Sequence, residues 1–172
     1  MADLDVFRST IARVLFALAF LHVPLLALIT WALGRDPWPI LLGAAACLLL
    51  PAVLSLLKRP MSAVAMALAV ALVGQTSLLV FAFTGHPWQV EMHFYYFAVL
   101  AMLSGFCDWR VMVVAAALIA GHHLSLNFIL PAAVYPGGSD FLRVVTHAIP
   151  VVIETAMLIL IGHAIRSAFA AA

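Results

Sequence analysis

Six long apolar runs fill most of this sequence, at about residues 7–33, 38–57, 61–84, 88–106, 110–130 and 140–169. A helix needs about 20 apolar residues to cross the hydrocarbon core of a bilayer. Because unpaired backbone groups cannot face lipid, such runs form either helices or a closed barrel, and their unbroken length favours helices. We therefore predict an all-α polytopic membrane protein, with residues 1–172 as a single domain and a bundle of six transmembrane helices.

The amino-acid composition also indicates a membrane protein. Hydrophobic residues make up 67% of the chain and charged residues 9%, which is far from the average soluble domain. The first run continues too long to be a signal peptide and lacks a small-residue cleavage site. The expected surroundings are therefore a lipid bilayer, and nucleic acid is not an expected partner.

The positions of the basic residues predict the orientation of the bundle. An even number of spans puts both termini on one side of the membrane. Six basic residues fall on that side, and only Arg35 and Arg143 fall on the other. By the positive-inside rule, both termini of this multi-pass protein are cytoplasmic. The six are Arg8, Arg13, Lys58, Arg59, Arg110 and Arg166.

Ionisable side chains interrupt the apolar sequence between residues 91 and 154, where each costs several kcal/mol unless it is paired, solvated or bound. With a helical rise of about 1.5 Å per residue, the four histidines of this stretch fall about 8–12 Å below the outer surface. One carboxylate lies at the rim above them, and the other lies two turns below His147 on the same helical stripe. We predict that these residues form one metal site: Glu91, His93, His122, His123, His147 and Glu154.

Imidazole is a common ligand of copper, zinc and iron, and its second ring nitrogen needs an acceptor. Four further side chains are predicted to support the ligands by hydrogen bonds: Asn127, His22, Gln75 and Arg143. Two other interpretations remain open, which are ordinary hydrogen bonds between helices and a proton pathway. By contrast, His163 lies about 160° around its helix from His147 and near the opposite face, so we do not expect it to bind metal. We expect Cys47 and Cys107 to be inert thiols.

Haem b is an alternative to an ion site. Two axial histidines on different helices would bind its iron, and a run of small residues leaves room for the porphyrin. Haem would use only two of the four histidines and would leave Glu91 without a role, whereas one or two copper, zinc or iron ions would use three or four imidazoles. The small residues are Ala115, Ala116, Ala117, Ala120 and Gly121.

Several short motifs recur together between about residues 88 and 160. They are Glu91-Met92-His93-Phe94-Tyr95-Tyr96-Phe97, Asp108-Trp109-Arg110, His122-His123-Leu124 with Asn127-Phe128, and His147 with Glu154. This series resembles the multi-span N-terminal membrane region of a group of bacterial methyl-accepting chemotaxis proteins, and related segments precede diguanylate cyclase and histidine kinase modules. The resemblance implies a sensor whose last helix continues into a cytoplasmic signalling module. Since the sequence stops at Ala172, we expect either a standalone relative or an excised sensor region.

The function predicted from the sequence is a membrane-embedded sensor domain. It binds a transition-metal centre near the periplasmic side of a bacterial inner membrane and signals through the last helix, and a homodimer is a candidate assembly. The first alternative is a b-type haem membrane cytochrome or a haem-based redox or gas sensor. The second alternative is a metal-dependent membrane enzyme. The sequence contains no Ser-His-Asp arrangement and no zinc-protease helix motif, which argues against this alternative.

Overall fold

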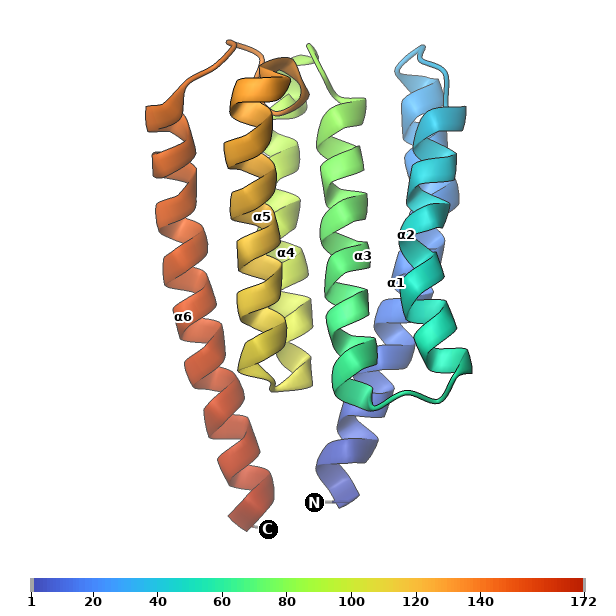
Figure 1. Ribbon diagram of the computed structural model, residues 1–172, viewed down its shortest axis with the longest axis vertical. Coiled ribbons are helices and arrows are strands. Elements are labelled where there is room, and N and C mark those ends of the chain that lie inside the picture. Colours follow the sequence, from blue (N-terminus) through green and yellow to red (C-terminus); the bar gives the residue numbers. More distant parts are fainter. Residues whose placement is uncertain (1, 172) are drawn as a thin grey trace.

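The computed structural model describes residues 2–171, and within that range it contains helices and no strands (Figure 1). This confirms the predicted all-α class. The α-helices are α1 (Ala2–Ala32), α2 (Trp38–Leu56), α3 (Met61–Ala82), α4 (Phe94–Leu103), α5 (Trp109–Ile129) and α6 (Phe141–Ala171). Four short 3-10 helices join them: η1 (Pro87–Gln89), η2 (Glu91–His93), η3 (Ser104–Phe106) and η4 (Pro131–Ala133).

Five of these helices, α1, α2, α3, α5 and α6, are long and apolar enough to cross a membrane. The apolar run predicted at 88–106 differs from the others, because only 94–103 is α-helical and 3-10 turns flank it. A physical reason lies in Gln89, whose amide is bonded to the backbone of Gly85 and Ala132 in the neighbouring loops. These two hydrogen bonds hold the start of the 88–106 run among the loops and keep it out of a regular α-helix.

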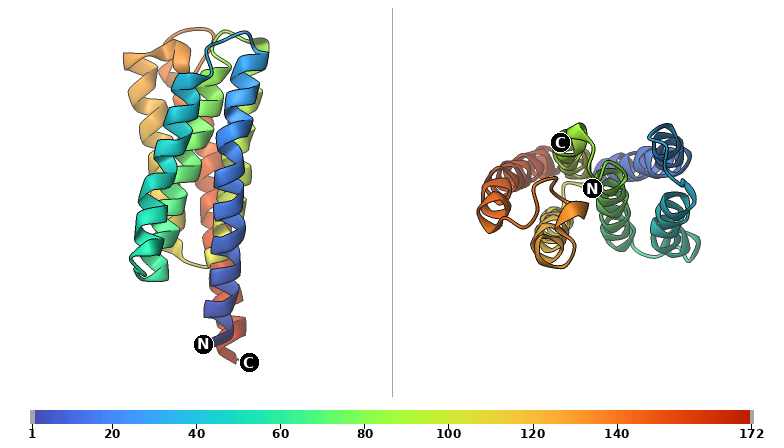
Figure 2. Two further views of the ribbon diagram at one scale, coloured as in Figure 1. Left: turned by 90° about the vertical axis from the view of Figure 1, so that its right-hand side faces the viewer. Right: turned by 90° about the horizontal axis from the view of Figure 1, so that it is seen from above.

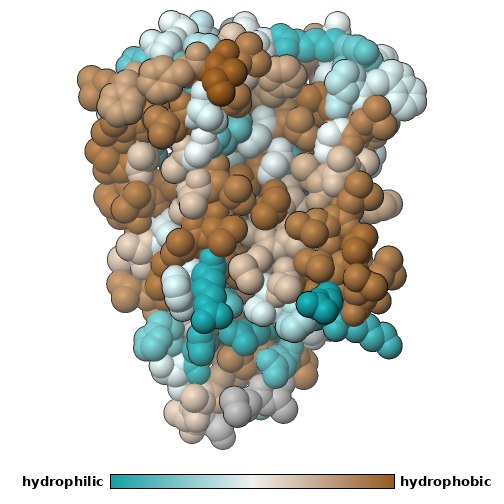
Figure 3. All heavy atoms as spheres, in the orientation of Figure 1, coloured by the Kyte–Doolittle hydropathy of each residue, from teal (hydrophilic) through white to brown (hydrophobic). Residues whose placement is uncertain are grey.

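The central helix of the bundle is α3. It packs against α1 and α2 on one side and against α4 and α5 on the other, while α6 packs on α4 and α5 (Figure 2). Small buried residues along α3, such as Ala65, Ala69 and Ala71, let the neighbouring backbones approach closely. Exposed large apolar side chains cover the outside of the bundle between more polar ends (Figure 3). This exterior suits contact with a lipid bilayer.

Local sequence explains where individual helices start and stop. Gly34 adopts a positive φ of 72°, and the N–H of Arg35 then bonds to the carbonyl of Thr30, which ends α1. Asp140 caps α6, because its Oδ1 accepts the N–H of Arg143 at 3.0 Å. Ser139 accepts a hydrogen bond from an α5 side chain.

Both termini lie at one end of the bundle, which we call the terminal end, and there α1 and α6 extend beyond the other helices (Figure 1). The rings of Phe7 and Phe169 contact each other there, with centroids 5.7 Å apart. Arg8 donates from Nε to the carbonyl of Phe106 at 2.8 Å, so α1 is also tied to the turn before α5. The opposite end, which we call the loop end, carries η1, η2 and η4 and the start of α6.

Candidate functional site

Three histidines from three segments meet near the loop end. His93 comes from η2, His123 from α5 and His147 from α6. The ring centroid of His93 lies 5.2 Å from that of His123 and 5.7 Å from that of His147. The centroids of His123 and His147 are 6.3 Å apart. We call these three residues the histidine cluster. The coincidence of depth predicted from the sequence therefore corresponds to side chains that are near neighbours in space.

Each ring of the histidine cluster is held in the same way. Its Nδ1 lies 2.8–3.0 Å from the backbone carbonyl four residues earlier, which is that of Gln89, Ile119 or Arg143. A carbonyl can only accept a hydrogen bond, so Nδ1 must carry the hydrogen and Nε2 keeps a free lone pair. Within residues 2–171, none of the three Nε2 atoms has a hydrogen-bond partner, and Nε2 of His93 is fully buried.

This arrangement matches the chemistry of metal-binding histidines, which usually donate the other ring N–H to a carbonyl or carboxylate. With metal–nitrogen bonds of about 2.1 Å and tetrahedral angles, three imidazoles bound through Nε2 have ring centroids about 5 Å apart. The observed separations of 5.2–6.3 Å approach that value. As the side chains stand, no three His, Cys, Asp or Glu residues in the described part of the chain are already arranged as a metal site. The rings would therefore have to turn inward to bind an ion together.

Tyr135 covers the histidine cluster, and the sequence reasoning missed it. Its ring is fully buried and stacks on His93 at 5.8 Å with an angle of 6° between the planes, and it meets the edge of His147 at 5.3 Å. Its hydroxyl is buried without a hydrogen-bond partner among the described residues. Burial raises the pKa of Tyr135 to about 12, so its hydroxyl stays protonated at neutral pH. The one sign of this role in the sequence is that Tyr135 is an isolated aromatic residue in a loop rich in Pro and Gly.

The fourth predicted histidine, His122, lies beside the histidine cluster and not within it. Its ring contacts His123 edge-on at 5.2 Å, and its Nδ1 is 3.4 Å from the hydroxyl of Tyr96. Tyr96 is buried, shares its hydroxyl with Ser77 on α3, and contacts both His93 and His123. Adjacent residues on a helix point about 100° apart, so only one of this histidine pair can face the cluster directly.

Two of the predicted supporting residues hold the loops around the cluster. Asn127 is fully buried, donates from Nδ2 to Ser139 Oγ, and accepts the N–H of Asp140 on Oδ1 at 2.8 Å. It thereby ties the end of α5 to the start of α6. Arg143 offers its carbonyl to His147, and its guanidinium lies over the ring of Tyr135 at 5.3 Å. Both act on the position of the cluster through the backbone or through Tyr135.

The two predicted carboxylates lie outside the histidine cluster. Glu91 is exposed on η2, at the rim of the loop end. Glu154 is half-buried on α6, about 10 Å along the helix from His147 by helical rise. Its Oε2 is buried with no hydrogen-bond partner in the described range. The participation of Glu91 and Glu154 in the metal site therefore stays a prediction.

His22 and Gln75 form a separate polar cluster on α1 and α3. Nδ1 of His22 lies 3.0 Å from Gln75 Oε1, and its Nε2 lies 2.7 Å from the hydroxyl of Tyr95. The Gln75 amide nitrogen also donates to the carbonyls of Ala19 and Ala44. All these groups are paired with one another. This is the ordinary hydrogen bonding between helices that the sequence left open for His22.

An apolar cavity of about 490 Å³ lies beside the histidine cluster, between α4, α5 and α6. The three cluster histidines line it together with Tyr96. Small residues on two helices make room for it, namely Ala116 and Ala120 on α5 and Ala148 on α6. The remaining lining is branched aliphatic or aromatic, so the imidazoles are the principal polar feature of the space.

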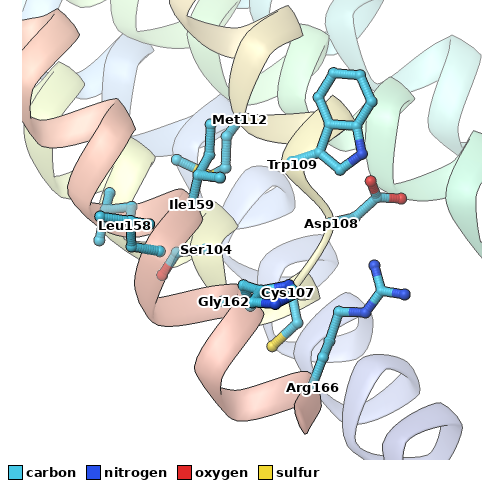
Figure 4. Close-up of a pocket in the computed structure, with 11 residues that line it drawn as sticks. Ser104, Cys107, Asp108, Trp109, Met112, Leu158, Ile159, Gly162 and Arg166 are labelled. Carbon is cyan, nitrogen blue, oxygen red and sulfur yellow. The ribbon is translucent and has the colours of Figure 1, made fainter.

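A smaller pocket of about 180 Å³ lies at the terminal end, between α6 and the turn that precedes α5 (Figure 4). It contains Cys107, Asp108 and Arg166, and His163 also lines it. His163 is thus at the opposite end of the bundle from the histidine cluster, as the sequence predicts. Burial raises the pKa of the Cys107 thiol, which is consistent with the inert thiol expected there.

Comparison with protein-family models, with curated proteins and with solved structures found no match to this chain.

Proposed function

We propose that this protein is a six-span membrane sensor domain that binds a copper, zinc or iron ion through His93, His123 and His147. One observation carries the proposal: the three neighbouring imidazoles each donate from Nδ1 to a carbonyl and each leave Nε2 free. An unpaired polar group in a buried site costs about 1–3 kcal/mol. Nε2 of His93 is such a group, and a cation shared with the free Nε2 atoms of the neighbouring His123 and His147 would remove that cost. His122 would serve as a fourth ligand or support the site through Tyr96.

Signalling through α6 follows from the position of this helix. His147 and Glu154 lie on it, and it then runs to the terminal end without a break. Its 31 residues span about 45 Å, which exceeds the hydrocarbon thickness of about 30 Å. At the terminal end, Gly162 packs against the backbone of Cys107, where an added Cβ would lie 3.4 Å from the Cys107 Cα. A small shift of His147 would therefore be passed to the projecting end of α6 and α1.

Two further points support this proposal. The basic residues favour cytoplasmic termini in a bacterial inner membrane, which places the histidine cluster near the periplasmic side and the output end of α6 in the cytoplasm. The motifs of residues 88–160 resemble the membrane region of chemotaxis receptors, in which the last membrane helix leads to a signalling module. The cytoplasmic partner of α6 is accordingly proposed to be a helical signalling module.

Haem b is a second candidate, and the apolar cavity is the observation that favours it. The cavity is bordered by His123 and His147 on neighbouring helices, and Ala116, Ala120 and Ala148 widen it. A haem sensor would use these two histidines as axial ligands. It would leave His93, whose Nε2 is buried and unpartnered, without a role.

The absorption spectrum and the elemental composition of the purified protein separate these candidates. We expect a transition metal bound at a fixed ratio to protein, with no Soret band. A Soret band would favour haem b. Protein that binds neither haem nor copper, zinc or iron, when each is supplied during purification, would overturn the proposal.

A further inference from the structure

The wall of the apolar cavity reaches the apolar outer surface of the bundle, so we expect the cavity to open toward lipid. On α6 its wall includes Ile149, Val152 and Ile153, which are 55%, 64% and 60% exposed on the outside of the bundle. On the side of the loop end, Val134 and Tyr135 are fully buried beneath the η4 loop. A molecule that reaches the histidine cluster through this cavity would therefore approach sideways, from the bilayer.

The size of the cavity restricts what fills it. A water molecule occupies about 30 Å³ in the liquid, so about 490 Å³ is some sixteen times that volume. A bare ion or a diatomic gas would leave most of this space empty. The walls offer apolar surface except at the imidazoles, so the occupant must be largely apolar and must carry its polar group at one end.

The chemistry of that polar end follows from the histidine cluster. Because every Nδ1 is engaged with a carbonyl, the imidazoles present acceptors and no donors to the cavity. A plain acyl chain would fill the apolar part and leave these acceptors unpaired. A hydroxyl on a flat ring would satisfy an acceptor, and the rings of Tyr96 and Phe97 that border the cavity would pack on that flat ring.

We propose that the cavity binds the ring of a membrane-soluble quinol, with its hydroxyl edge at the histidine cluster and its apolar tail leaving between α5 and α6. This inference rests on the proposed sensory function, since it names the chemical class of the stimulus. The site would thus sense a lipid-dissolved molecule. Because one Nε2 lone pair cannot bind a metal ion and accept a hydroxyl at once, the imidazoles anchor the quinol in the metal-free protein, and metal and quinol compete for the histidine cluster. Bound metal and bound quinol are separate observables, so the two proposals can fail separately.

The test uses the full chain in phosphatidylcholine nanodiscs, with decylubiquinol as the probe. Bound quinol per protein is measured above the level in empty nanodiscs, and metal content is measured in the same samples. Ala120→Phe fills the cavity, and Ala117→Phe adds the same ring to an exposed position of the same helix that does not line the cavity. We expect about tenfold weaker quinol binding in Ala120→Phe and no more than about a twofold change in Ala117→Phe.

Ala148→Phe, which fills the same cavity from α6, serves if Ala120→Phe does not fold. Wild-type protein that binds no more quinol than empty nanodiscs would overturn the inference, as would normal binding in both folded cavity variants. A Soret band from haem that fills the cavity would also overturn it. Wild-type protein that binds quinol but no metal would support the cavity site and contradict the proposed metal centre.

Discussion

Two groups of side chains differ in how their histidine ring nitrogens are used. One is the histidine cluster, and the other consists of His22, Gln75 and Tyr95, which we call the paired cluster. His22 employs both nitrogens, since Nδ1 donates to Gln75 Oε1 and Nε2 accepts from the hydroxyl of Tyr95. In the histidine cluster of η2, α5 and α6, each ring uses only Nδ1. A buried histidine is therefore not in itself a sign of a ligand site. The free second nitrogen, repeated in three neighbours, is what distinguishes a binding site from a bond between helices.

The largest expected difference between the clusters is in metal content. Changing His93, His123 or His147 to Ala removes a proposed ligand, and we expect each variant to lose most of the bound metal. His22→Ala, the matched control from the paired cluster, should keep its metal. Elemental analysis of folded, purified variants measures this. Full metal retention in all of the His93, His122, His123 and His147 variants would remove the distinction between the two clusters.

Variants of Tyr135 test whether the ring that covers the histidine cluster contributes to metal affinity. Tyr135→Ala removes the ring that stacks on His93, and we expect about tenfold weaker metal affinity, as for other residues that orient ligands. Tyr135→Phe keeps the ring and removes only a hydroxyl that has no partner in residues 2–171, so its affinity should remain near that of the wild type. Competition with a chelator of known affinity gives both values. Equal effects of the two changes would refute the role given to the ring.

The hydrogen bonds of the paired cluster are expected to stabilise the fold. His22→Ala leaves Gln75 and Tyr95 with lost partners, and a buried polar group without a partner costs about 1–3 kcal/mol. We expect a lower thermal unfolding temperature in detergent, with metal content unchanged. His22→Gln, which can still bond to one neighbour, should restore part of the loss. A His22→Ala protein as stable as the wild type would show that these hydrogen bonds do not hold the helices together.

Glu154 is expected to affect signalling more than binding. Glu154→Gln keeps shape and hydrogen-bonding capacity, so we expect normal folding and normal metal content, but a weaker response in a chimera that joins α6 to a receptor signalling module. Glu154→Leu serves as the apolar comparison. Loss of metal in Glu154→Gln would make this residue a ligand. Unchanged metal, stability and signalling in both variants would place Glu154 outside the site.

The smallest effect is expected at His163, which lines the pocket at the terminal end, far along α6 from His147. His163→Ala should leave metal content unchanged. Metal loss in a well-folded His163→Ala protein, measured by the same elemental analysis, would show that the assignment of ligands to the loop end is wrong.

Periodic and repeated features were predictable from the sequence, and features set by loops were not. Apolar run length predicted the helical class. Depth along three runs predicted one layer of four histidines, and the structure brings three of them, His93, His123 and His147, together and leaves His122 beside them. The short α4 was not predicted, because the Gln89 amide donates to the carbonyl of Ala132, which lies 43 residues further along the chain. Tyr135 was missed for the same reason, since its burial depends on how an irregular loop folds over the histidine cluster. Rotation by about 100° per residue could have separated His122 from His123, but only with the partner helices known.

X-ray absorption spectroscopy of metal-loaded protein shows whether the three free Nε2 atoms bind one metal ion. We expect a spectrum dominated by imidazole nitrogens, with about three imidazoles at about 2.0–2.1 Å from a copper or zinc ion. We also expect that His93→Ala lowers the number of imidazoles, while His22→Ala leaves the spectrum unchanged. A spectrum with sulfur ligands or without imidazole, or one that His22→Ala alters and His93→Ala does not, would contradict the account.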